Sequence, residues 1–239
     1  MNALSPHRTG LIAHGERAGF TLVELLVAIA LIATLTAFLL GDLGGSNKTS
    51  LLRSAQGAVS GTFAVARMRA IATGKTSRLM LNIDAASAAS PPRFLRYLVL
   101  QTQTSSGWET VSELFLPEGI YFVPGDFSSL PDGLFFDGAS AWVKNDAITA
   151  LRSTVFRSTQ IVTETINSTV AEQWVSFSIS GVGTTGQAGD LVLALGRPRA
   201  AGAYTEGESP IELYHHDSVC GMMVSAYGLA VSISDRSGF

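Results

Sequence analysis

Residues Ala18 to Ala33 read Ala-Gly-Phe-Thr-Leu-Val-Glu-Leu-Leu-Val-Ala-Ile-Ala-Leu-Ile-Ala, an apolar stretch with a single carboxylate, Glu24. The apolar run extends from Phe20 to Leu40 and comprises 21 residues with that one ionisable group. At a rise of about 1.5 Å per residue, a helix of this length would be about 31 Å long, enough to cross a hydrocarbon core. The run therefore predicts a transmembrane helix at the start of the fold.

The charge inside this helix needs an explanation of its own. A carboxylate in a membrane span costs about 2 to 3 kcal/mol unless it has a partner, so Glu24 is expected to be a functional group. The residues before the run carry Arg8 and Arg17 against one acid, Glu16. Because basic flanks stay in the cytoplasm, the rest of the chain is expected to be translocated.

Two ordinary segments would share part of this pattern. A secretory signal peptide has an apolar region of 7 to 15 residues followed by small residues at a cleavage site. Here the run is longer, and the segment from Gly41 to Gly45 offers only a poor site. An uncleaved signal anchor accounts for everything except Glu24.

The glycine, aromatic residue, acid and apolar run together resemble the class III signal of type IV pilins and type II secretion pseudopilins. The resemblance implies that an aspartyl prepilin peptidase cuts after Gly19 and N-methylates the new first residue, Phe20. It also implies that Glu24 neutralises the terminal amine of a neighbouring subunit, which would set the register of packing. Thr21, Leu22 and Val23 occupy the intervening positions of the motif.

Composition agrees with an exported, membrane-derived subunit. The chain has 239 residues, is 46% hydrophobic and 15% charged, and has a mean hydropathy of +0.30. The net charge is −3 and the sequence has no basic run, so no nucleic-acid partner is expected. The single cysteine, Cys220, cannot form a disulfide within the chain, and its apolar neighbours predict a small residue in a buried strand.

Three glycines follow the apolar run, at Gly41, Gly44 and Gly45. Each weakens a helix interior by about 1 kcal/mol relative to alanine, so a bend or a melted segment is expected there. Since pilins commonly carry a helix-weakening residue near this distance from the mature N-terminus, the resemblance implies that the glycines let the helix stretch on assembly.

The segment from Ser46 to Thr73 has the spacing of an amphipathic helix. Gly57 and Gly61 lie inside it and would lower its stability unless something packs closely there. Gly74 is a natural stop. The expected buried face consists of Leu52, Ala55, Val59, Phe63, Ala66 and Ala70, and the opposite side carries Arg53, Gln56, Ser60 and Arg67.

After Gly74 the period changes to that of β-strands. Ser77 to Ile83 alternates, with Leu79, Leu81 and Ile83 on one side and Arg78, Met80 and Asn82 on the other. Further strands are predicted at Phe94 to Leu100, Ile120 to Val123, Leu134 to Phe136, Trp174 to Ile179, Leu191 to Leu195, and Tyr227 to Ile233. The predicted fold is α+β: a long N-terminal transmembrane and amphipathic helix packed on an antiparallel β-sheet domain.

The predicted domains are a leader at 1–19, the transmembrane half of the helix at 20–43, its amphipathic half at 44–74, and the β domain at 75–239. Within pilin-like proteins, the segment from Phe63 to Leu81 resembles the helix end and first strand of GspH/FimT-type minor pseudopilins. Val175 to Gly181, Leu191 to Leu193 and Gly221 to Ile233 resemble their late strands. The region 105–170 departs from that pattern through added length.

No catalytic residue, metal ligand or cofactor is predicted. His215, His216 and Asp217 are expected in an exposed turn, because adjacent side chains of a strand point to opposite faces. Asp126, Asp132 and Asp137 could offer oxygen ligands to a calcium ion, a hypothesis weakened because they lack the close alternation of an EF-hand loop. Gly181 to Gly186 is interpreted as a β connection rather than a nucleotide loop, and Trp174 and Phe177 as core.

Together these features predict a minor pilin or pseudopilin: a structural subunit, not an enzyme, cleaved after Gly19 and assembled into or at the tip of a type IV pilus or type II secretion pseudopilus. Its partners would be other pilin-like subunits, the prepilin peptidase and the inner-membrane assembly platform. The precursor would span the inner membrane once, with the β domain outside the cytoplasm. Two alternatives remain open: a filament-displayed or membrane-anchored adhesin or binding module, and a membrane-anchored enzyme using the same signal.

Overall fold

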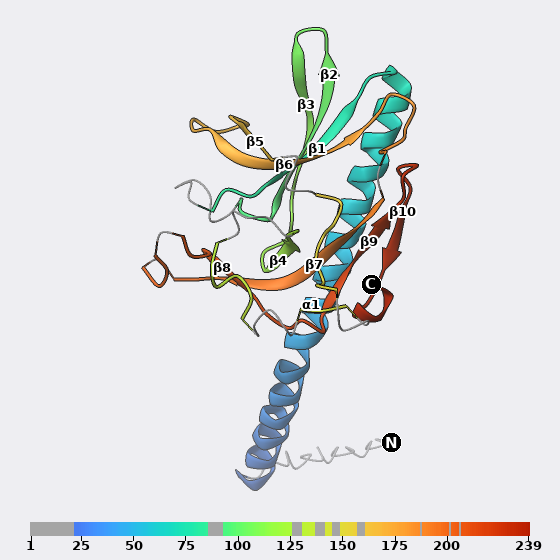
Figure 1. Ribbon diagram of the computed structural model, residues 1–239. Helices are drawn as coiled ribbons and strands as arrows, with labels where there is room; N and C mark the ends of the chain where they lie inside the picture. The colour runs from blue at the N-terminus through green and yellow to red at the C-terminus, as the bar shows by residue number, and fades with distance from the viewer. Residues whose placement is uncertain are drawn as a thin grey trace, which may run out of the picture. The chain divides into compact units, whose positions relative to one another are not determined.

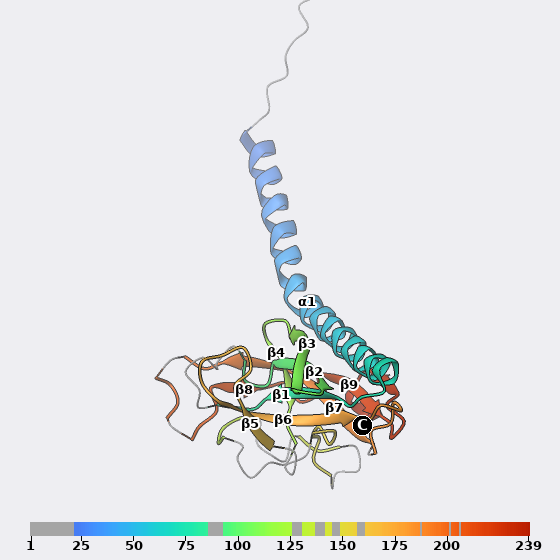
Figure 2. The same ribbon diagram turned by 90° about the horizontal axis from the view of Figure 1, so that it is seen from above.

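The computed structural model describes residues 22–85, 93–125, 131–136, 142–144, 149–156, 161–186, 188–200, 202–205 and 207–239, without the side chains of 33–47. The chain divides into two compact units, one ending at Gly44 and the other running from Gly45 to Phe239. The second unit contains all of the strands, and its architecture is visible in Figures 1 and 2.

Helix α1 spans Leu22–Thr73. It is helical through Gly41, Gly44 and Gly45, so the backbone there is not melted, and the proposed flexibility of these glycines stays a prediction. Gly74 ends the helix with a φ of 66°, a conformation in which glycine avoids the steric penalty of a side chain. Among the residues described, no helix is both long and apolar enough to cross a membrane.

The strands form two antiparallel sheets, which confirms the α+β class. The first sheet has the order β3-β2-β1-β6-β5, with bounds Gly107–Phe115, Tyr97–Thr104, Ser77–Asn82, Glu172–Ile179 and Ile161–Glu164. The second has the order β10-β9-β7-β4, with bounds Ala230–Ile233, Val219–Val224, Gly189–Pro198 and Ile120–Val123. Strand β8, Ile211–Leu213, pairs with the end of β7, and a 3₁₀ helix, η3, covers Arg236–Gly238.

One hydrophobic core joins the helix to both sheets. It includes Phe63 of α1, Leu79 of β1, Phe177 of β6 and Leu193 of β7, all almost completely buried. The second half of α1 runs beside β9 and β10, and its end extends past the β9–β10 turn (Figure 1). Burial of this amphipathic face provides most of the helix's stability, as is usual for helices in globular domains.

The outer face of the first sheet is also buried. Met80, Tyr97, Val99, Ile166 and Trp174 form a second cluster there, separate from the helix-facing core. The predicted alternation in β1 is correct, since Leu79 and Leu81 belong to one cluster and Met80 to the other. Alternation alone does not reveal that all six residues of β1 are buried.

Several predicted strands differ in extent. Leu134 to Phe136 is not a strand: Phe135 makes only an isolated bridge to Leu213. The strand expected from Phe94 begins at Tyr97, because Leu95 adopts a φ of 55° in the preceding turn. The last strand begins at Ala230 rather than Tyr227, because a turn precedes it.

The middle region supplies strands that the sequence pattern did not reveal. Strands β3 and β5 form the two edges of the first sheet. In β3 the register slips by one residue, since Leu100 pairs with Ser112 and Gln101 with Thr110. This bulge breaks the two-residue period, and the other face of an edge strand does not need apolar residues.

Candidate functional site

Glu24 lies in the first turn of α1 and is exposed. Carboxylates are favoured there because the unpaired N–H groups of a helix N-terminus carry a partial positive charge. Around it, the large apolar side chains of Leu22, Val23, Leu25, Leu26, Val27, Ile29, Leu31 and Ile32 are all more than half exposed. Such a surface requires cover from outside the chain.

The other residues of the predicted processing motif, Gly19 and Phe20, lie outside the described residues. The structure therefore does not test the cleavage, the methylation or the pairing of Glu24 with a neighbour's amine, and these stay predictions. Asp126 and Asp137 of the calcium hypothesis also lie outside the described residues. The backbone of Asp132 forms an isolated β-bridge with that of Glu208. The described residues contain no group of three side chains that could hold a metal ion.

Farther along α1, all six residues predicted for the buried face are confirmed as core. The largest is Phe63, whose ring lies 5.4 Å from that of Phe177 on β6. This contact joins the helix to the middle of the first sheet, and it supports the prediction that Phe177 is a core residue.

Two polar residues of the opposite side are structural, which sequence reasoning missed. Gln56 is buried, and its Nε2 donates to the carbonyl oxygens of Gly221, at 2.5 Å, and Ile233, at 2.8 Å. These carbonyls belong to β9 and β10, so one amide attaches the helix to both strands. The four-residue spacing from Leu52 places Gln56 beside the buried stripe and could have revealed it.

Arg67, about three helical turns after Gln56, makes a similar attachment. Its Nε donates to the carbonyl oxygens of Gly183, at 3.3 Å, and Tyr227, at 3.1 Å. Gly183 belongs to the β6–β7 loop and Tyr227 to the β9–β10 turn. Arg67 therefore holds two loops against the end of α1, a role that the spacing of apolar residues could not indicate.

Cys220 is buried in β9, as predicted. Its Sγ lies 3.5 Å from the carbonyl oxygen of Leu52, and burial raises the pKa of the thiol to about 12. A group with this pKa is not a thiolate at neutral pH. The surroundings favour a structural role for the side chain.

The histidine pair is in a turn, as predicted. His215 is exposed, whereas His216 is half-buried with its Nδ1 2.6 Å from an Arg236 nitrogen. Arg236 also donates to Asp217 at 2.9 Å and to the carbonyl oxygen of Val143 at 2.7 Å. These contacts attach the C-terminal residues to the turn.

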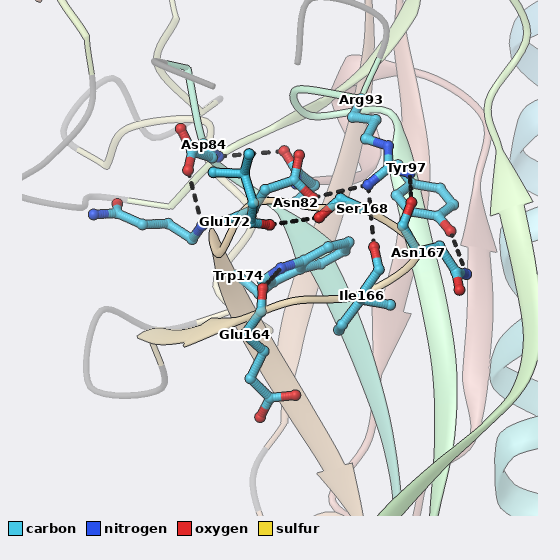
Figure 3. Close-up of polar contacts among 12 residues, drawn as sticks. Asn82, Asp84, Arg93, Tyr97, Glu164, Ile166, Asn167, Ser168, Glu172 and Trp174 are labelled. Atoms are coloured by element: carbon cyan, nitrogen blue, oxygen red, sulfur yellow. Dashed lines mark hydrogen bonds and ion pairs between the residues drawn. The ribbon is translucent and has the colours of Figure 1, made fainter. Parts of the chain in front are cut away.

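A polar network covers the outer cluster of the first sheet (Figure 3). Glu172 is fully buried and pairs with Arg93 at 2.8 Å, and Arg93 also donates to the carbonyl oxygen of Ile166 at 3.1 Å. The Tyr97 hydroxyl donates to Glu113 at 2.6 Å. Burial, reinforced by Glu113, raises the pKa of Tyr97 to about 12.

These groups are bonded to one another and to backbone carbonyls, an arrangement that orders the irregular segment 166–170 over Trp174. Glu172 pairs with Arg93 through Oε2, whereas its Oε1 has no hydrogen-bond partner among the described residues. Buried Glu–Arg pairs also occur in structural networks. A tyrosine with a raised pKa is also a poor base at neutral pH. The network therefore gives no support to the hypothesis of an enzyme.

Comparison with known proteins agrees with the N-terminal motif. Residues 16–40 match the family described as the prokaryotic N-terminal methylation motif. No curated protein matches the chain. Two structures of the minor pseudopilin EpsH from the type 2 secretion system of Vibrio cholerae align with 77% of this chain and with 95% and 97% of theirs.

The sequence identities to these structures are 13% and 14%, and the TM-scores are 0.35 and 0.36. A likeness this weak does not establish a common fold. The methylation motif, which includes Gly19, Phe20 and Glu24, rests on the sequence alone and does not depend on that likeness. What the comparisons show is that the chain carries the prokaryotic N-terminal methylation motif at residues 16–40.

Proposed function

We propose that this chain is the precursor of a minor pilin or pseudopilin, a structural subunit without catalytic activity. Peptidase cleavage after Gly19 and methylation of Phe20 produce the mature subunit. The apolar run from Phe20 to Leu40 holds it in the inner membrane before assembly, with the β domain outside the cytoplasm. The assembly platform then inserts it into a filament beside other pilin-like subunits.

The observation that carries the proposal is the carboxylate of Glu24 within a helix surface of exposed apolar side chains. In the membrane this carboxylate needs a positive partner. The amine of a neighbour's Phe20 would provide one, and only after cleavage, because the precursor has a peptide bond at that position. Glu24 would thus link processing to assembly.

The hypothesis of an adhesin has less support. The exposed aromatic side chains of the region 105–170 are Trp108, Phe115 and Phe136 among the described residues. Trp108 and Phe115 are near opposite ends of β3, about 23 Å apart at the rise of an extended strand, and so do not form one patch. The Arg78 guanidinium also lies 4.1 Å from the centre of the Trp108 ring and covers part of it.

The test combines mass spectrometry with a substitution. The native protein should begin at methyl-Phe20, and an intact Met1 or an N-terminus near Gly41 would overturn the proposal. Glu24→Gln should leave processing intact and lower incorporation into filaments on the order of 30-fold or more, the equivalent of an unpaired charge in lipid. Val27→Ala, on the same exposed helix surface, is the matched control, and wild-type incorporation of Glu24→Gln would refute the charge pairing.

A further inference from the structure

Exposed apolar side chains gather where three segments of the β domain meet. They come from the last turns of α1, the β6–β7 loop, and the β9–β10 turn with the residue that follows it. We call this group the cap surface: Met68, Ile71, Val182, Tyr227 and Leu229, which are 63%, 47%, 77%, 70% and 54% exposed. Apolar side chains that are exposed together in this way are typical of interaction sites.

The three segments are joined by hydrogen bonds. Arg67 of α1 donates to Gly183 in the loop and to Tyr227 in the turn. The loop also bonds to the turn directly, because the Thr185 N–H donates to the carbonyl oxygen of Ala226 at 2.9 Å. In Figures 1 and 2 the end of α1, the loop and the turn lie side by side at one edge of the domain.

Two glycines allow this close approach. Gly183 has a φ of +83°, and a Cβ added there would lie 2.6 Å from Cδ1 of Ile71. Gly228 has a φ of +70°, and its added Cβ would lie 2.8 Å from the carbonyl oxygen of Gly183. Both positions therefore disfavour any other residue, and glycine allows the two loops to lie close to the helix.

The charges beside the cap surface all have the same sign. The segments 65–75, 180–186 and 225–231 contain three charged residues, Arg67, Arg69 and Lys75. Arg69 and Lys75 are exposed. A two-fold pairing of two copies through this surface would bring like charges together, which is unfavourable. The partner therefore needs apolar side chains flanked by carboxylates.

We propose that the cap surface binds a different pilin-like subunit, one that presents an apolar group bordered by acidic residues. This inference rests on the proposed function, because it is the assembled filament that brings such a subunit to the β domain. Contacts through the first residues of α1 would align the helices, whereas the cap surface would select the neighbour of the β domain.

The test is photo-crosslinking of the full-length chain in cells that assemble the filament. The photoreactive residue benzoylphenylalanine replaces Tyr227, and in a control it replaces Val170, which is also exposed but belongs to the segment over the first sheet. The expected result is a covalent adduct at position 227, but not at 170, whose mass and peptides identify another processed pilin-like subunit. The crosslinked peptide should contain apolar residues and at least one carboxylate.

Charge reversal adds a second measurement. Arg69→Glu combined with Lys75→Glu should lower the adduct yield at least fivefold, whereas Arg53→Glu, an exposed cation on the same helix, should leave the yield unchanged. Changing the partner's mapped carboxylate to lysine should restore the yield. These residues are exposed, so circular dichroism should confirm that the variants fold.

The outcomes separate the two proposals. An adduct only with a second copy, only with lipid, or none at all, in a subunit that is processed at Phe20 and incorporated, would overturn the cap-surface inference and leave the proposed function standing. An unprocessed chain that begins at Met1 would overturn the proposed function and the inference that rests on it.

Discussion

The two ends of α1 use apolar side chains in opposite ways. From Leu22 to Ile32, every large apolar residue is more than half exposed, whereas the stripe from Leu52 to Ala70 is at most 5% exposed. The stripe finds its cover in the two sheets of the same chain. The first residues have no such cover among the described residues, so their apolar surface points to contacts outside the chain.

The polar residues of the two ends of α1 also differ in what they contact. Gln56 and Arg67 donate to backbone carbonyls of the β domain, and so they determine where the helix lies on the sheets. Glu24 is exposed in the apolar part of the helix. The comparison indicates that the second half of α1 stabilises the β domain and that the first residues of α1 are available for contacts outside the chain.

Phe63→Ala tests the different roles of the two ends of α1, and it should have the largest effect on the free energy of unfolding. Removal of a fully buried phenylalanine should cost about 3–5 kcal/mol in the free energy of unfolding, through lost transfer energy and a cavity. Denaturant unfolding of the full-length chain in detergent, followed by tryptophan fluorescence, would measure the change. Val27→Ala should stay within about 0.5 kcal/mol. If Val27→Ala cost as much as Phe63→Ala, the division of the helix would be wrong.

Gln56→Ala should have the next largest effect. It removes two hydrogen bonds and leaves the Gly221 and Ile233 carbonyls without this partner, at a cost of about 1–3 kcal/mol. The same unfolding experiment applies, with the exposed Arg53→Ala as the control. A loss no greater than that of the control would mean that the apolar stripe alone positions the helix.

Gly57→Ala and Gly61→Ala should each stabilise the domain, by about 0.5–1 kcal/mol, because an added Cβ meets nothing within 4 Å at either position. Gly221→Ala is the opposite control, since its Cβ would lie 1.9 Å from the carbonyl oxygen of Leu191. Thermal unfolding would rank the three variants. Destabilisation by Gly57→Ala would show that these glycines have a role inside the subunit.

The smallest expected effect concerns the reactivity of the Cys220 thiol. The raised pKa and the burial predict that a maleimide reagent at pH 8 modifies the native chain slowly and the unfolded chain rapidly. Because the folded pKa of about 12 exceeds the unfolded value near 9.0, this contribution to stability is complete below pH 9 and is lost as the pH rises toward 12. Rapid native labelling, followed by mass spectrometry, would place the thiol at the surface.

Sequence periodicity predicted the helix-facing core well. The burial of Leu52, Val59 and Phe63 and the bounds of β4 follow from regular spacing and are confirmed. The prediction of a strand at Leu134 to Phe136 was wrong, because three apolar residues do not specify a partner strand. Strands β3 and β5 were missed because edge strands need few apolar residues, and the bulge in β3 interrupts its period.

By itself the sequence determined the N-terminal methylation motif, which includes Gly19, Phe20 and Glu24, and the buried face of the helix, because both depend on residues close together in the chain. Only the tertiary structure decided that Gln56 and Arg67 attach the helix to strands and turns more than 110 residues away. It also decided that Met68, Val182 and Tyr227 lie at one exposed surface. Such contacts depend on how the sheets pack, which local spacing does not encode.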